Sequence, residues 1–422
     1  MYDLVKLQLP IKSEFVSYIT CSKGNYTGGE VDLKLFAQYG VRLSAGSISI
    51  NEFGETMAER LHHPYESLAS SNSSLAFKIY QGGANYFPFI ELKASPAKLL
   101  QGHNVYGSTD VRMCFTAPLL AFIKNYPDIF HDLVDHHNIE VAGFDVNKMA
   151  RVENRFQVIN VISAIGKVST GQIKPSHSFD TSCMFNAGSK NSVLKVYAKE
   201  SEVEKQIKDI ANKAKKTKEP YLQMQLKALQ QQSVLEMAKN AIRFEVSKHK
   251  LWLKKRAIPT QLSKFLDYVE AFNDKAKEND THSFDETVWL DSFNPIFKAF
   301  EGTNVNTFND DEVLKALKAK YLTMNAKTGK PSYTKAMRLF RFFKSVKNEG
   351  LQVVKETTPE RSFYRNLSDL SKVVPKAQLQ NFESEEQSNV VPLVRMINVD
   401  FAKQLPENWE EPTYVYNQLM SA

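Results

Sequence analysis

The sequence predicts an α+β fold, in which an N-terminal antiparallel-sheet domain with a helical insertion precedes a mainly helical, basic C-terminal domain. Residues 1–200 contain short segments in which apolar and polar residues alternate between Gly, Asn and Ser turns, as in half-buried strands. Residues 201–241 and much of the chain after Pro259 instead repeat apolar side chains at helical spacing. With 422 residues, 42% of them hydrophobic, the chain is long enough for two or three domains. We expect domains at 1–258 and 259–422, with the insertion at 201–241.

The first strands follow from simple alternation. Residues 1–10 alternate, and in residues 89–94 Glu91 falls on the polar side of the predicted strand. Ser95-Pro96 ends that strand, and two glycines bracket a tight turn that carries His103 and Asn104. Helical patterns at 113–125 and 156–166 interrupt the strands.

Three later strands place charged or phenolic groups on one face. These are Asp145 on the first, Lys195, Tyr197 and Lys199 on the second, and Arg243, Glu245 and Ser247 on the third. Asp145 shares its predicted face with apolar residues, a setting that a carboxylate rarely enters without a partner. In residues 193–199 the lysines are on the same side as the tyrosine. We expect Lys195 and Lys199 to lower the pKa of Tyr197 or to hold a phosphate.

The formal net charge of +7 and a pI of about 8.9 favour a polyanionic partner. Residues 315–347 carry ten lysines and arginines and no acidic residue. Aromatic residues are interleaved with them, and of these Phe340 and Phe343 are expected in the core. Basic groups can neutralise phosphates, so we predict DNA contacts from Lys335, Arg338 and Arg341.

The segment that follows predicts two helices joined by a turn. Residues 351–354 supply the first helix, Thr357-Thr358-Pro359 the turn, and a helix carrying Arg361 and Arg365 on one face the second. A helix-turn-helix whose second helix reads a DNA groove fits this pattern, and so does an ordinary helical hairpin. Both interpretations remain open at this point, and we count Arg361 and Arg365 among the predicted DNA contacts.

The three cysteines form no metal-binding spacing, and an odd, unpatterned count is typical of a reducing cytoplasm. The alternating N-terminus does not resemble a signal peptide, and no window is apolar enough to span a membrane. We expect no membrane partner.

The segment at 91–107, Glu-Leu-Lys-Ala-Ser-Pro-Ala-Lys-Leu-Leu-Gln-Gly-His-Asn-Val-Tyr-Gly, resembles the signature of the filamentous-phage replication initiators, the gene II protein family. Further segments match this family in order and spacing across nearly the whole chain: residues 63–68, 75–80, 144–146, 195–199, 242–246, 297–302 and 389–401.

The resemblance implies a rolling-circle initiator-like nuclease domain that nicks the viral strand of circular double-stranded phage DNA at its origin. A tyrosine attacks the phosphate and keeps the 5′ end as a phosphotyrosine, and the displaced single strand is later rejoined into a circle. The tyrosine–lysine segment around Tyr197 resembles the nucleophile motif of the family. A host helicase, a host DNA polymerase and a location in the host bacterial cytoplasm are implied as well.

Tyrosine needs activation, since its unperturbed pKa is about 10. Mg²⁺ or Mn²⁺, which favour oxygen ligands, would activate the phosphate. The candidate ligands are Glu245, Asp145, Glu91 and His103. The His-hydrophobic-His metal motif of the broader rolling-circle nuclease class is absent from the sequence, which leaves the ligand set open.

A competing hypothesis is a non-catalytic, sequence-specific DNA-binding regulator of replication or transcription. It explains the basic segment and the helix pair equally well, but not a tyrosine flanked by lysines beside carboxylates. A tyrosine recombinase would need an array of arginines and a histidine around a late tyrosine, which the sequence lacks.

Overall fold

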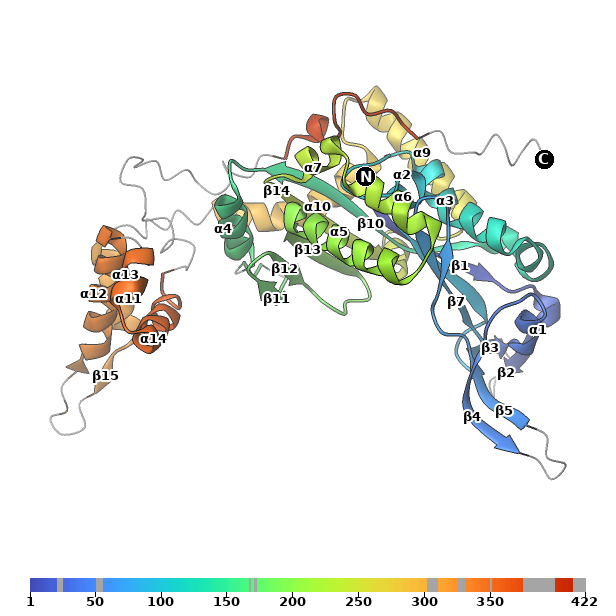
Figure 1. Ribbon diagram of the computed structural model, residues 1–422, viewed down its shortest axis with the longest axis horizontal. Coiled ribbons are helices and arrows are strands. Elements are labelled where there is room, and N and C mark those ends of the chain that lie inside the picture. Colours follow the sequence, from blue (N-terminus) through green and yellow to red (C-terminus); the bar gives the residue numbers. More distant parts are fainter. Residues whose placement is uncertain are drawn as a thin grey trace.

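The computed structural model describes residues 1–20, 26–50, 56–166, 168–170, 173–301, 310–324, 329, 331–349, 351–374 and 399–412. Within these residues the chain combines a large antiparallel sheet, helices on both of its faces, and a separate helical core near the C-terminus (Figure 1). The predicted α+β class is therefore confirmed.

The central sheet has nine strands in the described part of the chain, and every neighbouring pair is antiparallel. In spatial order they are β11 (Pro175–Phe179), β12 (Ser182–Phe185), β13 (Ser192–Ala198), β14 (Ala241–His249), β10 (Glu140–Arg151), β1 (Tyr2–Pro10), β9 (Phe89–Ala94), β7 (Ser74–Tyr80) and β6 (Glu66–Ala69). The N-terminal strand therefore lies at the middle of the sheet, beside strands that come much later in the chain.

One face of this sheet is apolar and covered by helices. These helices are α3 (Val111–Asn125), α4 (Arg155–Ile165), α8 (Lys250–Lys255), α9 (Leu262–Glu278) and α10 (Phe284–Glu301). Phe144 and Phe244 of the sheet pack among their side chains, and the Trp289 indole of α10 donates a hydrogen bond to the Phe244 carbonyl over 3.0 Å. Helices α9 and α10, which the sequence-based division assigns to the second domain, thus contribute to the core of the sheet.

The other face is polar at its centre and covered at one end by the helical insertion. Helices α5 (Lys199–Lys216), α6 (Pro220–Leu229) and α7 (Gln232–Ala238) form it, close to the predicted 201–241. Val203 and Ile210 of α5 pack with Met149 of β10 in a cluster of their own, which also includes the loop after α2 (Pro96–Gln101). In Figure 1, α5 crosses in front of the sheet and α10 lies behind it.

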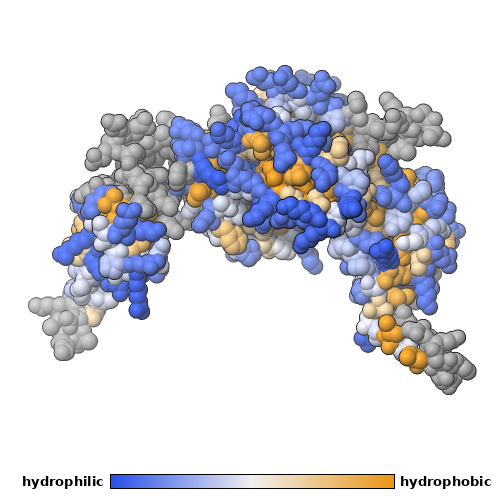
Figure 2. Space-filling view, viewed as in Figure 1, coloured by the Kyte–Doolittle hydropathy of each residue, from blue (hydrophilic) through white to orange (hydrophobic). Residues whose placement is uncertain are grey.

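Smaller strands extend from this body. A three-stranded sheet joins β2 (Ser17–Thr20), β3 (Tyr26–Glu30) and β8 (Gly82–Gly83), and β4 (Ser44–Ile50) pairs with β5 (Thr56–His62); the short helix α1 (Lys34–Ala37) lies between them in sequence. The β4–β5 hairpin projects as an arm, and Figure 2 shows hydrophobic residues near its end. Ile48 and Ile50 are exposed there.

The C-terminal helices have a hydrophobic cluster of their own, formed within residues 313–374. They are α11 (Asp310–Lys320), α12 (Thr334–Glu349), α13 (Leu351–Thr357) and α14 (Glu360–Leu370), with a short hairpin of β15 (Thr323–Met324) and β16 (Pro331–Ser332). Phe340 and Phe343 belong to this cluster, as predicted. The predicted pair of helices around the turn at Thr358 and Pro359 is α13 and α14.

The predicted C-terminal strand is not found where it can be checked. Its residues 389–398 lie outside the described part of the chain, and residues 401–403 form a 3₁₀ turn instead. The Asp400 carboxylate accepts a hydrogen bond from the Ala402 amide at 3.0 Å, which starts this turn. The Gln404 side chain then bonds to both backbone groups of Met149, at 2.8 and 2.9 Å, so the segment packs against β10.

Cys114 and Cys183 are buried free thiols, and Cys21 lies outside the described residues. Among the described helices, none has the length and apolar character that crossing a bilayer requires.

Candidate functional site

Tyr197 lies near the end of β13, on the polar face of the sheet. Its hydroxyl donates a hydrogen bond to Glu245 Oε2 over 3.0 Å. The two side chains share a face because β13 and β14 pair antiparallel with Lys195 opposite Glu245 and Tyr197 opposite Arg243. The side-chain alternation predicted for both strands is thereby confirmed.

A second carboxylate reaches the same place from the next strand. Asp145 on β10 lies opposite Ser247 of β14, which puts it diagonally across from Glu245. The Lys195 ammonium lies between the two acids, 2.5 Å from Glu245 Oε1 and 3.4 Å from Asp145 Oδ2. Both carboxylates are buried, whereas the Lys195 side chain is 32% exposed.

A buried polar network supports the tyrosine from the covered end of the face. Arg243 is fully buried, donates to Asp3 Oδ2 at 3.2 Å and also bonds to the Val105 carbonyl. Asn104 joins the network by donating to Asp3 Oδ1 at 2.8 Å. Neither Asp3 nor Arg243 was among the predicted site residues. The alternation of Arg243 with Glu245 was a usable signal for the arginine, but nothing in the sequence pairs it with Asp3.

Lys199 occupies a different position from the one predicted. Strand β13 ends at Ala198, and Lys199 begins helix α5. Its ammonium is fully buried, bonded to Asn104 Oδ1 at 3.1 Å and Glu202 Oε2 at 2.6 Å, and lies 6.0 Å from the centre of the Tyr197 ring. Lys199 therefore lies beside Tyr197, as predicted, but below the ring rather than in line along a strand.

The lysines do not lower the pKa of Tyr197, contrary to expectation. Burial and the negative charge of Glu245 raise the pKa of the Tyr197 phenol well above its usual value. The Lys195 charge is already matched by the two carboxylates, whose charge raises the pKa of Lys195. Burial and the nearby Arg243 lower the pKa of Lys199 to about 8. The tyrosine is therefore protonated at neutral pH and needs a base.

Glu245 meets the chemical requirement for that base. Burial, followed by repulsion from Asp3, raises the pKa of Glu245 to about 7, although Lys195 opposes the shift. A carboxylate with a pKa near neutral pH, already bonded to the phenol, is suited to accept a proton from it.

The four predicted metal ligands do not come together. Glu91 is on β9, where it accepts a hydrogen bond from Tyr65 and lies 3.4 Å from the Lys6 ammonium. His103 is buried in the turn after α2, and burial together with Lys199 and Arg243 lowers its pKa to about 3. A cation next to His103 would be repelled by both of these positive groups.

Asp145 and Glu245 are thus the two predicted ligands that share one place. Across the part of the chain that the structure describes, no group of three or more His, Cys, Asp or Glu side chains is arranged to hold a metal ion. Two carboxylates still suit Mg²⁺, which commonly keeps water and substrate phosphate as its other ligands. His249, which continues the alternation of β14 beyond Ser247, is close enough for Asp145 to affect its pKa, which burial lowers. It was not predicted.

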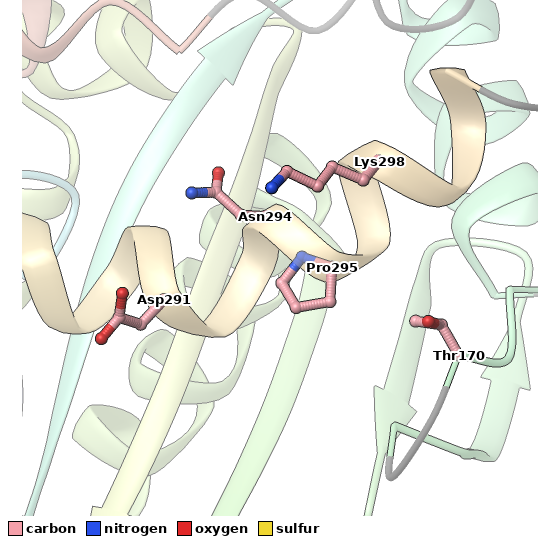
Figure 3. A pocket seen from close by; sticks show the side chains of 5 residues that line it. All are labelled: Thr170, Asp291, Asn294, Pro295 and Lys298. Atoms are coloured by element: carbon pink, nitrogen blue, oxygen red, sulfur yellow. The ribbon is translucent and has the colours of Figure 1, made fainter.

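A hollow beside α10 is not part of this site (Figure 3). Asp291, Asn294, Pro295 and Lys298 of α10 line it together with Thr170. Because α10 covers the apolar face of the sheet, the hollow belongs to the side opposite Tyr197.

The predicted DNA contacts lie on the surfaces of α12 and α14. Lys335 and Arg338 lie 2.8 and 3.9 Å from Asp369, so their charge is partly matched within the protein. Arg341, Arg361 and Arg365 are exposed. Phe363 and Leu367 bury the opposite side of α14, which leaves both of its arginines on the outer face.

Comparisons with known proteins match both parts of the chain. The family model for the N-terminal part of the phage replication-associated protein, the gene II protein, matches residues 1–275, and the model for its C-terminal part matches residues 326–415. The replication-associated protein of Enterobacteria phage f1 is 37% identical over 418 residues, 98% of this chain and 99% of that protein. The protein of the same name from Salmonella phage IKe is 37% identical over 422 residues, 99% and 98% of the two chains.

A solved rolling-circle replication initiator from Geobacillus stearothermophilus covers 67% of this chain and 84% of its own, with 9% identity and a TM-score of 0.23. A similarity this low carries no argument about the fold. The sequence matches are decisive, because they span both halves in the same order: the chain belongs to the gene II family of phage replication-associated proteins.

Proposed function

We propose that this protein initiates rolling-circle replication by nicking the viral strand of its circular double-stranded phage DNA, with Tyr197 as the nucleophile. The observation that carries the proposal is the hydrogen bond from Tyr197 to a buried glutamate whose pKa is near 7, beside a second carboxylate. Membership of a replication-associated family supports it.

The nicking step follows from these contacts. The Tyr197 oxygen attacks the scissile phosphate while Glu245 accepts the phenolic proton. The new bond joins phosphorus to the tyrosine oxygen, and the bond from phosphorus to O3′ breaks. O3′ takes up a proton and becomes a free 3′-hydroxyl, which a host DNA polymerase would extend while a host helicase unwinds the duplex.

Rejoining reverses these events. A 3′-hydroxyl attacks the phosphotyrosine, the displaced single strand closes into a circle, and the tyrosine oxygen regains a proton. One phosphodiester is exchanged for another in each step, so no external energy source is required.

The lysines have different roles in this mechanism. Lys195 is partly exposed, and its ammonium can turn from the carboxylates toward a phosphate oxygen. Lys199 is buried and bonded to Asn104 and Glu202, so it is a positioning residue that fixes the start of α5 against the tyrosine ring.

A divalent cation, Mg²⁺ or Mn²⁺, fits the carboxylates of Asp145 and Glu245. When bound, it would polarise the phosphate and offset its negative charge. Lys195 contacts both carboxylates and therefore competes with the cation for them.

The deciding experiment is a nicking assay on the phage's own supercoiled replicative-form DNA, with Mg²⁺ or with EDTA. We expect open circles only with Mg²⁺, and peptide mapping should find DNA linked to the peptide that contains Tyr197. Origin binding without any cut under either condition would refute the nickase and favour a non-catalytic regulator.

We further propose that the C-terminal helices hold the DNA through the exposed Arg341, Arg361 and Arg365. Replacing Arg361 and Arg365 by Ala should weaken duplex binding and reduce the slope of log affinity against log salt by about one for each phosphate that is no longer neutralised. Lys372, which lies on the surface 3.2 Å from Asp369, provides a control substitution. An unchanged salt slope in the double variant would exclude these arginines from the interface.

A further inference from the structure

The polar face that carries Tyr197 continues beyond the site, across β1, β9 and β7. Lys6 of β1 lies opposite Gly143 of β10 and Lys93 of β9, and Glu91 lies opposite Lys78 of β7. Since directly opposed residues point to the same side of a sheet, these side chains share the face of Asp145 and Tyr197. The ion pair of Lys6 with Glu91 at 3.4 Å confirms this arrangement.

At the far end of this face is a group of aromatic side chains, which we call the aromatic patch: Tyr65, Tyr80, Tyr86 and Phe89. Tyr80 and Phe89 stack with ring centres 4.7 Å apart and planes 20° apart, and Tyr86 meets Phe89 edge-on at 6.5 Å. The hydroxyls of Tyr65 and Tyr80 are 3.3 Å apart. Tyr65 is 51% exposed and Tyr86 46%.

These rings are held in place although they are exposed. The Tyr65 hydroxyl donates to Glu91, and the Lys78 ammonium lies 5.2 Å from the Tyr65 ring centre and 4.9 Å from that of Tyr80. Ordered aromatic surface lowers the entropic cost of binding, and so large an exposed aromatic group is unusual without a partner.

We propose that the aromatic patch binds unpaired bases of the DNA strand whose scissile phosphate lies at Tyr197. The inference rests on the proposed nicking function, because that function brings a single strand to this face. A base in a duplex has its two faces stacked on its neighbours, whereas an unpaired base can stack on a tyrosine or phenylalanine ring whatever its sequence.

The charge of the surface suits a nucleic acid strand. Lys6, Lys78 and Lys93 line the path between the patch and the site. The carboxylate among them, Glu91, is buried and engaged by Lys6 and Tyr65. The lysines can therefore neutralise phosphates while the rings take the bases.

The separation also fits a short single strand. Phe89 on β9 and Tyr80 on β7 lie four and five strand positions from β13. At about 4.8 Å per position this is about 19 to 24 Å. Such a distance corresponds to about six or seven nucleotides at the 3.4 Å rise of a duplex strand, and to fewer when the strand is extended.

The test is binding of a fluorescein-labelled single strand of the phage origin that spans the nick, followed by anisotropy in EDTA with the full chain. Replacing Tyr65 and Tyr80 together by Ala should weaken binding at least tenfold, since stacking of one base is worth roughly 5- to 150-fold in affinity. The salt dependence should not change, because no phosphate contact is removed.

Two matched controls separate stacking from other effects. Tyr65→Phe keeps the ring and loses the hydroxyl bond to Glu91, and it should bind like the native chain. Phe179→Ala removes an aromatic ring that is 68% exposed on β11, at the opposite edge of the sheet, and should have no effect. In the native chain, an abasic substitution at the stacked position should weaken binding, and in the double variant it should not.

Equal binding by the native chain and the Tyr65/Tyr80 double variant would overturn the patch, whether or not Tyr197 nicks DNA. A loss in Tyr65→Phe as large as in Tyr65→Ala would overturn stacking and assign the effect to the hydroxyl. If the double variant loses single-strand binding but the native chain forms no Tyr197–DNA link, the patch stands and the nicking function falls.

Discussion

Two tyrosines on the same face of the central sheet donate to a glutamate that also contacts a lysine. Tyr197 bonds to Glu245, which contacts Lys195. Tyr65 bonds to Glu91, which pairs with Lys6. The local arrangement is nearly the same, yet we assign nucleophilic chemistry to the first tyrosine and base stacking to the second.

The surroundings of the two tyrosines justify this difference. Near Tyr197 there is a second carboxylate, Asp145, and the buried cations Arg243 and Lys199 lie beside the ring. Tyr65 is half exposed, and its nearest groups are another phenol and the Lys78 ammonium. A tyrosine–glutamate–lysine arrangement is thus not sufficient to identify a nuclease site. The paired carboxylates and the buried cations distinguish the reactive position.

The largest expected effect comes from removing each hydroxyl. Tyr197→Phe should reduce nicking by at least about 10⁴-fold, because no other group on the site takes over as nucleophile. Tyr65→Phe should nick at the native rate. Conversion of supercoiled to open-circular DNA on agarose gels measures both, with filter binding of the origin as the control for folding. Normal nicking by Tyr197→Phe would show that the wrong tyrosine has been assigned.

The next contrast is between the two glutamates. Glu245→Gln should slow nicking by about 10³-fold, since it removes the proton acceptor and one cation ligand together. Glu91→Gln should change the rate by no more than about threefold, because in our account Glu91 only positions Tyr65. Single-turnover nicking at saturating protein measures this. Equal losses in the two variants would remove the distinction between the two arrangements.

The pH dependence of cation binding should show the raised pKa of Glu245. A protonated carboxyl is a poor ligand, and with a pKa of about 7 Glu245 is mostly protonated below pH 7 and mostly ionised above it. The Mg²⁺ concentration for half-maximal nicking should therefore rise up to about tenfold per pH unit as the pH falls from 7 to 6. A Mg²⁺ requirement that is constant over this range would argue against Glu245 as a ligand.

The smallest effect concerns the lysines. Lys195→Met removes the ammonium that contacts both carboxylates, and Mn²⁺ should then bind about fivefold more tightly, equivalent to about 1 kcal/mol for a partly exposed ion pair. Lys6→Met, which frees Glu91 instead, should leave Mn²⁺ affinity unchanged. Titration of the free Mn²⁺ electron paramagnetic resonance signal measures both. Weaker binding in Lys195→Met would mean that the lysine assists the cation rather than competing with it.

Much of the candidate site could be predicted from local pattern. Side chains alternate along a strand with a period of two, so Lys195 and Tyr197 had to share a face, as did Arg243 and Glu245. The helical insertion and the helices α12 to α14 were equally visible, because their apolar spacing is local. The point where β13 ends was not: Lys199 continues the alternation in sequence, but the chain turns into α5 at that residue.

What the sequence determined by itself is the set of elements, the polar face of each strand and the family to which the chain belongs, because these depend on neighbouring residues. The tertiary structure alone decided which faces meet. It placed β14 between β13 and β10, so that Asp145 joined Glu245 while Glu91 and His103 did not. It also brought Asp3 to Arg243 across 240 positions of sequence. The raised pKa values of Tyr197 and Glu245 belong to the same level, because burial sets them and burial exists only once distant segments pack together.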